Sequence, residues 1–325
     1  MANHGQQSRN SEAFTSFPTE ILTQIFLENK LPDRYQSPPQ EVAISHVSRR
    51  FREVAINTPR LWTTVRTRPV RDLISIEYLD LYLRRSEPCL ITVVPSPWRS
   101  TDELEAHSAL IILHIHRLRE LIVRTICRPF MAAALALFRD VSAPRLERLE
   151  IIDEWDDHDA PTTRMEYFDI FTLGSPSLHS LHLQTLSTHL YVPNSRASVT
   201  TLELSQTFSI GKTDLHEVLT GFPNLTHLQI CNELIDRFRT EGRIFLPSVR
   251  SFTTQIEKGW ASPAIWPLLD MPHVEKVILH GLSNKPVTKF PAKSSSAYTS
   301  VLSSSEVAYL VGIAPFCVGE CLQRK

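Results

Sequence analysis

The chain has 325 residues, of which 42% are hydrophobic and 21% are charged, as is typical of a soluble globular protein. Its formal net charge of −1 excludes the bulk positive field that draws proteins to nucleic acid or to an anionic membrane. Residues 1–12 are polar, and no apolar run approaches the ~18 residues that a membrane helix needs. We therefore expect an intracellular protein, cytoplasmic or nuclear, whose five scattered cysteines are reduced.

A helix is predicted to begin at Pro18. Proline suits the first position of a helix, because its missing N–H would have no partner there. The residues that follow form one apolar stripe at helical spacing, namely Ile21, Leu22, Ile25 and Phe26. The stripe ends in a predicted loop, because residues 31–39 include three prolines.

A second helix is predicted from Glu41 to the Thr58-Pro59 pair. Its apolar face consists of Ile44, Val47, Phe51, Val54 and Ala55, and the large pair Leu61-Trp62 follows. These apolar faces are larger than so small a unit can bury by itself. They indicate a module that docks onto a partner helix, and the alternative is an ordinary helical cap on a larger core.

Position by position, residues 14–65 resemble the F-box pattern. The shared features are a hydrophobe-Pro-x-Glu opening, Ile/Leu pairs, an Ile-Phe, a Val-x-Arg-x-aromatic-Arg and a Leu-Trp. Phe17, Ser48 and Phe51 depart from the family's commoner Leu, Cys and Trp. The long loop between the helices and the Thr-Pro-x-Leu-Trp ending resemble F-box-like proteins that are abundant in mushroom-forming (basidiomycete) fungi.

The resemblance implies that this block docks the Skp-type adaptor of a cullin-RING (SCF-type) ubiquitin ligase and, through it, the cullin. The residues that we expect to contact the adaptor are Pro18, Ile21, Leu22, Ile25, Phe26, Val47, Phe51, Leu61 and Trp62. Some of them must also form the module's own core.

From about residue 118 the phrase hydrophobe-x-x-hydrophobe-x-hydrophobe recurs. The seven examples are 118/121/123, 146/149/151, 178/181/183, 199/202/204, 225/228/230, 249/252/254 and 274/277/279. Their first positions are 28, 32, 21, 26, 24 and 25 residues apart, and in five of them a proline stands two residues earlier. This phrase and period resemble leucine-rich repeats, in which each unit supplies a short strand and a returning segment.

The expected fold class is therefore α/β, with a small N-terminal helical F-box followed by an irregular leucine-rich-repeat-like α/β solenoid. Such units stack because none can bury its apolar side alone. The family's Asn/Cys ladder position is not kept, since Leu186 and Glu233 occupy it in two units. An irregular α/β domain with similar strands is the alternative.

The predicted domains are a disordered tail at 1–13, the F-box-like domain at 14–65, the solenoid at 66–290 and a low-complexity or poorly ordered tail at 291–325. Within the solenoid, residues 66–117 form a lead-in with helices at 72–86 and 101–118 and a strand at 90–94. Further helices are predicted at 130–138, 215–222 and 265–269. The C-terminal tail is either a disordered end or the end of an incomplete product.

Residues between the strand anchors point away from the core, because side chains alternate along a strand. The candidate substrate-binding positions on this face are Arg148, Glu150, His182, Gln184, Glu203, His227, Gln229, Thr253, Lys276 and Ile278. The face is chemically mixed, so it names no ligand.

No catalytic, cofactor or metal site is predicted. The Gly211-Lys212-Thr213 sequence lacks the glycine that a phosphate loop needs at position 206. The histidine pairs 114/116 and 179/182 lack further ligands for a metal. We expect a non-catalytic, substrate-recruiting adaptor. A leucine-rich-repeat scaffold without a ubiquitin-ligase role and an enzyme with an unrecognised site are the alternatives.

Overall fold

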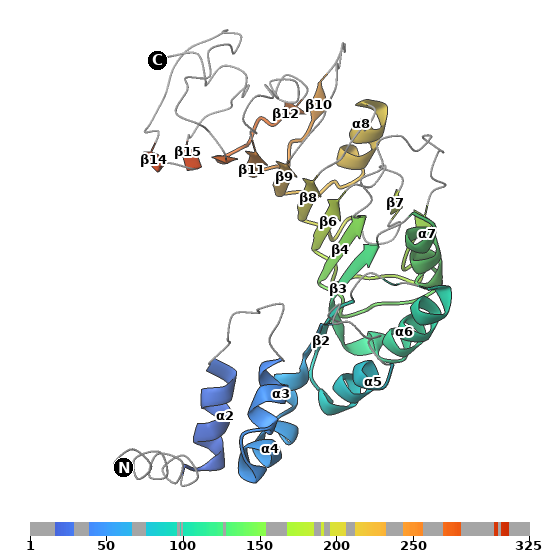
Figure 1. Ribbon diagram of the computed structural model, residues 1–325. Coiled ribbons are helices and arrows are strands. Elements are labelled where there is room, and N and C mark those ends of the chain that lie inside the picture. Colours follow the sequence, from blue (N-terminus) through green and yellow to red (C-terminus); the bar gives the residue numbers. More distant parts are fainter. Residues whose placement is uncertain are drawn as a thin grey trace.

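The protein is a mixed α/β molecule with N-terminal helices and a largely parallel sheet of eleven strands (Figure 1). The structure is a computed structural model. It describes residues 17–28, 39–66, 76–95, 98, 100–125, 128–153, 168–184, 190–191, 196–205, 212–231, 243–255, 269–280, 302–304 and 307–311. The predicted tail at 1–13 lies outside these residues.

The N-terminal unit contains α2 (Thr19–Glu28), α3 (Gln40–Ser45), α4 (Arg49–Ile56) and the 3-10 helix η1 (Pro59–Trp62). The carbonyl of Pro18 accepts hydrogen bonds from the amides of Ile21 and Leu22, each 3.1 Å long, so α2 starts where the proline predicts. Leu22, Phe26 and Val54 form a small core of their own.

The prediction of one continuous second helix from Glu41 is wrong, because the chain turns at residues 46–48 and divides it into α3 and α4. Ser48 is extended, and its hydroxyl accepts a hydrogen bond of 3.1 Å from the amide of Phe51. Serine satisfies an otherwise unpaired first-turn amide in this way, so it favours a new helix start over a helix interior.

The lead-in between the N-terminal unit and the repeated strands contains β1 (Thr64–Arg66), α5 (Ile76–Arg85), β2 (Ile91–Val94), α6 (Thr101–Leu113) and the 3-10 helix η2 (Ile115–Arg117). Strand β1, which the sequence analysis did not predict, pairs in parallel with β2. The helix predicted at 101–118 is shorter in the structure, because α6 ends at Leu113.

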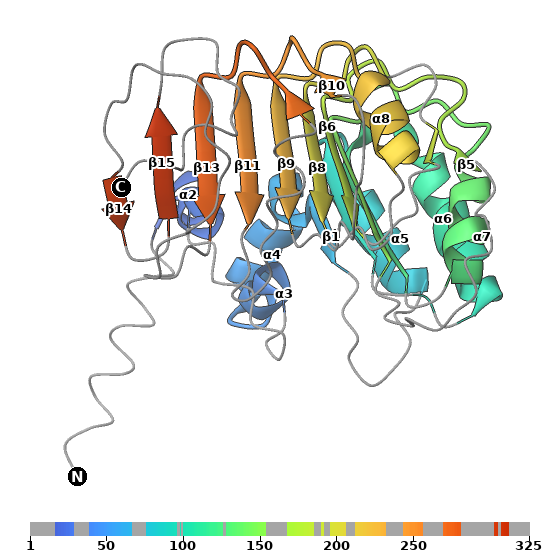
Figure 2. The ribbon, with the colours of Figure 1, turned by 90° about the horizontal axis from the view of Figure 1, so that it is seen from above.

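Each of the seven phrases overlaps one strand of the sheet. These strands are β3 (Leu118–Thr125), β4 (Arg148–Asp153), β6 (Ser180–Gln184), β8 (Thr201–Ser205), β9 (His227–Cys231), β11 (Ser251–Gln255) and β13 (Lys276–His280). They pair in parallel in chain order, and the middle anchors form one cross-strand row of Leu121, Leu149, Leu181, Leu202, Leu228, Phe252 and Val277. Figure 2 shows the later strands side by side with β9, β11 and β13 pointing the same way.

The described parts of the segments that return between these strands lie on one side of the sheet (Figure 1). They include α7 (Arg128–Leu137), α8 (Lys212–Thr220) and the paired short strands β5 (Phe168–Asp169) with β7 (Leu190–Tyr191) and β10 (Ile244–Phe245) with β12 (Leu269–Asp270). The predicted helix at 265–269 is contradicted at its last position, because Leu269 belongs to β12. Residues 265–268 lie outside the described part of the chain.

The sheet is an arc whose concave side faces away from α5, α6, α7 and α8 (Figure 1). Helices are about 10 Å wide and neighbouring strands only about 4.8 Å apart, so helices packed on one face spread that side. The anchors point toward the helices, and one continuous buried cluster joins most of them to Met131 and Ala134 of α7.

Polar side chains just before the strands connect neighbouring units. The residue preceding the first anchor donates to a carbonyl of the previous unit: Ser177 to Pro144 at 2.8 Å, Asn224 to Ala197 at 2.8 Å and Ser248 to Pro223 at 2.7 Å. Ser198 makes a related bond of 2.7 Å to Leu178. The residues of this ladder precede the strands in the chain, whereas the Asn/Cys ladder position of leucine-rich repeats follows them.

Of the predicted C-terminal tail, the structure describes β14 (Leu302–Ser304) and β15 (Val307–Val311). They pair antiparallel with each other, and β15 also pairs antiparallel with β13. The sequence analysis predicted neither strand. Among the described residues, none of the helices is both long and apolar enough to cross a membrane.

Candidate protein-interaction surfaces

Side-chain hydrogen bonds hold the N-terminal helices in a fixed arrangement. Gln40 at the start of α3 donates to the carbonyl of Phe26 near the end of α2, over 2.9 Å. At the other end of α2, the guanidinium of Arg50 donates to the carbonyl of Phe17. Arg52 also donates to the Ser45 carbonyl over 2.9 Å, which links α4 to α3. The start of α2 therefore lies beside the start of α4.

The nine residues predicted to contact an adaptor divide into three groups by exposure. Leu22, Phe26 and Trp62 are buried, with 1%, 5% and 1% of their surface exposed. The half-buried residues Ile25, Phe51 and Leu61 pack against the small core of the N-terminal unit. Pro18, Ile21 and Val47 are exposed. The structure thus leaves only the last group fully available to a partner.

The sequence analysis did not include Phe17 among the docking residues, yet its side chain is also exposed. Its position directly before Pro18, where the family pattern has its opening hydrophobe, was the signal that could have found it. Phe17 and Ile21 lie at the start of α2, which the Arg50 bond places beside α4, and Val47 lies in the turn before α4. We call Phe17, Pro18, Ile21 and Val47 the N-terminal apolar patch.

Trp62 joins the N-terminal unit to the rest of the molecule. Its indole N–H donates to the carbonyl of Ala55 over 2.8 Å, but its ring belongs to the main core of the sheet. The ring meets Tyr82 of α5 edge-to-face with centroids 5.0 Å apart, and the guanidinium of Arg85 lies 4.4 Å from its centroid. The tryptophan is therefore a structural joint rather than a free docking residue.

Tyr82 strengthens this joint through its hydroxyl, which donates to the carboxylate of Glu41 on α3. Burial, and secondarily the charge of Glu41, raise the pKa of the Tyr82 phenol far above its usual 10.0. The phenol consequently remains a hydrogen-bond donor over the whole physiological pH range.

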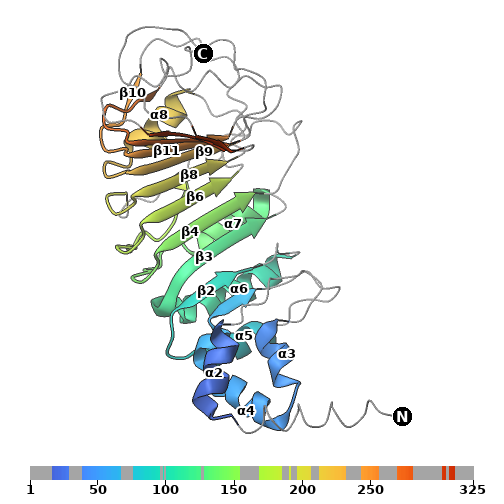
Figure 3. The same ribbon diagram turned by 90° about the vertical axis from the view of Figure 1, so that its left-hand side faces the viewer.

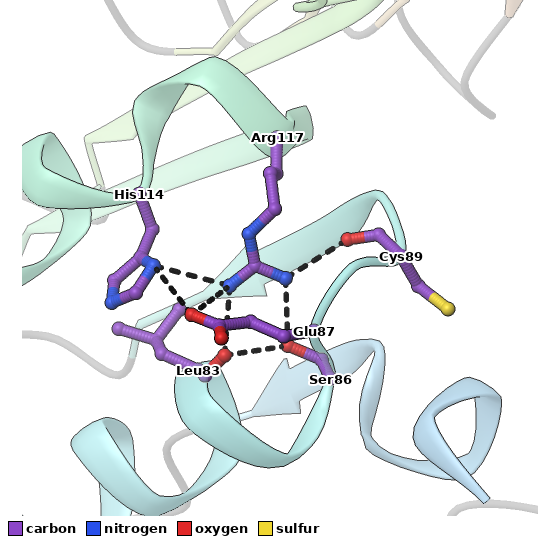
Figure 4. Close-up of polar contacts among 6 residues, drawn as sticks. All are labelled: Leu83, Ser86, Glu87, Cys89, His114 and Arg117. Atoms are coloured by element: carbon purple, nitrogen blue, oxygen red, sulfur yellow. Dashed lines mark hydrogen bonds and ion pairs between the residues drawn. The ribbon is translucent and has the colours of Figure 1, made fainter.

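Arg117, the last residue of η2, is buried against the end of α5, with only 6% of its surface exposed (Figure 4). Its guanidinium donates to the carbonyls of Leu83, at 2.7 Å, and Cys89, at 3.0 Å. Leu83 is in the last turn of α5, where carbonyls have no partner within the helix and a cation is favourable. Arg117 thus caps α5 and connects it to the first long strand.

The imidazole of His114 also contacts Arg117, with 3.1 Å between its Nδ1 and Nη2 of the guanidinium. Arginine can only donate, so Nδ1 accepts and His114 is neutral. Burial lowers the pKa of His114 from 6.5, and the positive charge of Arg117 lowers it further, against a smaller raising effect of Glu87.

The ten predicted substrate-binding residues all lie on the strands β4, β6, β8, β9, β11 and β13. The strand pairing places six of them in one row: Glu150, His182, Glu203, Gln229, Thr253 and Ile278. Arg148, His227 and Lys276 belong to a neighbouring row, and Gln184 lies in a third. We call this side the open sheet face, because no described helix covers β4 to β9 on it (Figure 3).

Hydrogen bonds connect the polar side chains of this face across the strands. His182 Nε2 lies 2.8 Å from Ser205 Oγ, and the Gln229 amide donates to Glu203 over 2.8 Å. Glu203 lies 3.9 Å from the same Nε2 atom. Ser205, His182 and Glu203 therefore do not form a serine-hydrolase relay. In such a relay the hydroxyl contacts one ring nitrogen of the histidine and the carboxylate contacts the opposite one.

No group of three or more His, Cys, Asp or Glu residues within the described part of the chain is arranged to hold a metal ion. His114 and His116 have ring centroids 6.5 Å apart. In the Gly-Lys-Thr sequence, Lys212 and Thr213 begin α8, and Gly211 lies outside the described residues.

Comparison with known protein families gives a match over the N-terminal unit. No curated protein matches the chain. The F-box-like family model matches residues 14–68, close to the predicted boundaries of 14–65. This range contains the N-terminal apolar patch, the small core and the Trp62 joint. Residues 14–68 are thus an F-box-like domain, which indicates a role in protein interaction or in substrate adaptation for a ubiquitin ligase.

Proposed function

We propose that the protein is a non-catalytic, substrate-recruiting adaptor of a cullin-RING ubiquitin ligase of the SCF type. The F-box-like domain binds a Skp-type adaptor, which connects the chain to the cullin, and the sheet binds a target protein. The chemistry is proximity, because a tethered target has a raised effective concentration near the conjugating enzyme. As part of the same proposal, the sheet is a leucine-rich-repeat-like solenoid, and the chain is of the kind found in mushroom-forming fungi.

The observation that carries this proposal is the exposure of apolar side chains on the F-box-like domain. Ile21 is 46% exposed and Val47 65% exposed, although both are large aliphatic residues. F-box domains generally bind Skp-type adaptors, and an apolar patch beside a helix start suits the groove or helix of a partner. The Trp62 joint supports the other half of the proposal, since it holds this patch in a fixed orientation to the sheet.

A pull-down of the purified full chain with a Skp-type adaptor tests the proposal. Ile21→Asp places a charge in the exposed patch without disturbing Leu22 or Phe26, so we expect folding to persist and adaptor binding to fall at least tenfold. Leu113→Asp is the matched control, because Leu113 is 70% exposed at the end of α6, outside the F-box-like domain. Circular dichroism checks that both variants remain folded.

Absence of binding by the wild-type chain would contradict the proposal, and so would equal binding by the Ile21→Asp variant. A second step adds the cullin to the bound complex. Adaptor binding without cullin recruitment would favour the alternative of a repeat scaffold that has no ubiquitin-ligase role.

A further inference from the structure

At the centre of the open sheet face, Glu203 and Gln229 offer hydrogen-bond acceptors, because the amide nitrogen of Gln229 already has partners within the face. The amide nitrogen of Gln229 donates to Glu203 Oε1 at 2.8 Å and contacts the Cys231 sulfur at 3.4 Å. The amide oxygen of Gln229 and the second carboxylate oxygen of Glu203 remain as acceptors. His182 Nε2 is engaged with Ser205. A ligand that contacts both Glu203 and Gln229 must therefore supply donors.

The charges of the region indicate that this ligand is a cation. Glu150 has Arg148 as its ion-pair partner on the same strand. Glu203, by contrast, has no lysine or arginine within ion-pair distance among the described residues, and Nε2 of His182 lies 3.9 Å from its carboxylate. The Glu203 side chain is 29% exposed, so a ligand can reach it. Among the described residues, no lysine or arginine therefore compensates its negative charge, and β8 carries it on the concave side of the arc.

The spacing of the acceptors favours a guanidinium over an ammonium. His182, Glu203 and Gln229 are direct cross-strand neighbours on β6, β8 and β9, in one row. Adjacent strands are about 4.8 Å apart, so the acceptors of Glu203 and Gln229 are close enough for one planar group with five N–H donors. A lysine ammonium is a compact point charge and cannot contact both in the same fork-like manner.

We propose that the open sheet face binds an arginine side chain of a protein partner at the centre of the sheet, with Glu203 as its counter-charge. Gln229 orients the carboxylate through its hydrogen bond and offers its amide oxygen as a second acceptor. The identification of this partner with the target protein rests on the proposed function, but the recognition of arginine rests only on the sheet face.

The probe for the test is a fluorescent pentapeptide, acetyl-Gly-Gly-Arg-Gly-Gly-amide, titrated against the full chain at low salt and followed by anisotropy. The same peptide with citrulline keeps the shape of arginine but removes its charge, and a lysine version keeps only the charge. We expect the arginine peptide to bind at least tenfold more tightly than the citrulline peptide, with the lysine peptide between them.

The Glu203→Gln variant preserves the size of the side chain and should lower the affinity for the arginine peptide at least tenfold. Glu275→Gln is the matched control, because Glu275 is an exposed acid outside the central row and pairs with Arg250 at 3.5 Å. Its affinity should equal that of the wild type. Equal binding of the arginine and citrulline peptides by the wild-type chain would overturn the inference, as would no binding at all or an unaffected Glu203→Gln variant.

The two proposals fail separately in these experiments. Loss of arginine recognition with intact adaptor binding overturns only the inference about the sheet face. Loss of adaptor binding with intact arginine recognition overturns only the ubiquitin-ligase proposal. Because the peptide comparison uses the wild-type chain, it remains decisive even where a Glu203 variant fails to fold.

Discussion

Single side chains in the F-box-like domain have different roles although their sequence pattern is uniform. Ile21 and Leu22 are adjacent on α2, yet Leu22 is 1% exposed and Ile21 46% exposed. Neighbouring residues on a helix point about 100° apart, so a pair of aliphatic residues can serve a core and a partner at once. The predicted docking list therefore contains both core and surface residues, and only the structure separates them.

His114 should make the stability of the protein depend on pH. Its pKa is lowered in the folded state, so the unfolded chain binds more protons as the pH falls below about 6.5. The contribution of His114 is fully present above pH 6.5 and is lost as the pH falls toward the folded pKa. We expect a lower urea midpoint at pH 5.5 than at pH 7.5, and a smaller difference in a His114→Gln variant.

The exposed His273, which is remote from His114 in the chain, provides the control for this prediction, and His273→Gln should keep the wild-type difference between the two pH values. A His114→Gln variant with an undiminished pH dependence would show that other groups cause it.

Among the secondary-structure elements, the seven repeated strands are positioned by two kinds of local contact. The anchors align in register and are buried, and the ladder of Ser177, Asn224 and Ser248 links the turns before the strands. A proline directly precedes each of these three ladder residues, and its fixed φ supports an extended approach to each strand. The returning segments differ widely in length and type, which the strands tolerate because each contacts mainly its neighbours.

Removal of one ladder hydroxyl should cost a small and measurable amount of stability. Ser248→Ala loses the hydrogen bond to the Pro223 carbonyl, and we expect a decrease of about 1 kcal/mol in the free energy of unfolding. Ser177→Ala should cost a similar amount, and the two effects should add because the sites lie in different units. Urea denaturation followed by circular dichroism measures both variants.

Ser180→Ala serves as the comparison, since Ser180 lies on the open sheet face within β6 rather than in the ladder. It should leave the unfolding free energy within about 0.5 kcal/mol of the wild type. An equal loss in all three variants would mean that the ladder has no special role.

In the molecule as a whole, the F-box-like domain is continuous with the sheet rather than attached to it by a free linker. Trp62 is buried in the main core, Leu61 packs against both clusters, and α5 contacts η1. Arg117 then fixes the end of α5 to the beginning of β3. The N-terminal apolar patch and the open sheet face are therefore held at a set distance and orientation, as a proximity mechanism requires.

Trp62→Ala should weaken the whole molecule and not only the N-terminal helices. Loss of a fully buried tryptophan typically costs about 3–5 kcal/mol, so we expect a large shift of the urea midpoint measured on the sheet signal. Arg85→Ala removes the cation–π contact and should cost about 1 kcal/mol, whereas Arg84→Ala removes only an exposed pair with Asp80 and should cost less than 0.5 kcal/mol. Unchanged unfolding of the sheet in Trp62→Ala would show that the two parts are independent.

The seven repeated strands of the sheet and the F-box-like domain were predictable from local patterns. Within each six-residue anchor phrase, the alternation of hydrophobic residues along the strand indicates which side chains are buried. The F-box-like pattern similarly combines a proline start, apolar pairs and a Leu-Trp ending within residues 14–65. These predictions succeeded because short-range spacing is enough to specify them.

Contacts between residues distant in the chain decided the rest. The turn before Ser48, the burial of Arg117 and the place of Trp62 in the sheet core depend on partners that helical or strand periodicity does not encode. The same holds for the candidate sites. Periodicity placed Glu203 and Gln229 on one face, but only the pairing of β8 with β9 made them neighbours. Among the described residues, Glu203 then has no lysine or arginine as an ion-pair partner.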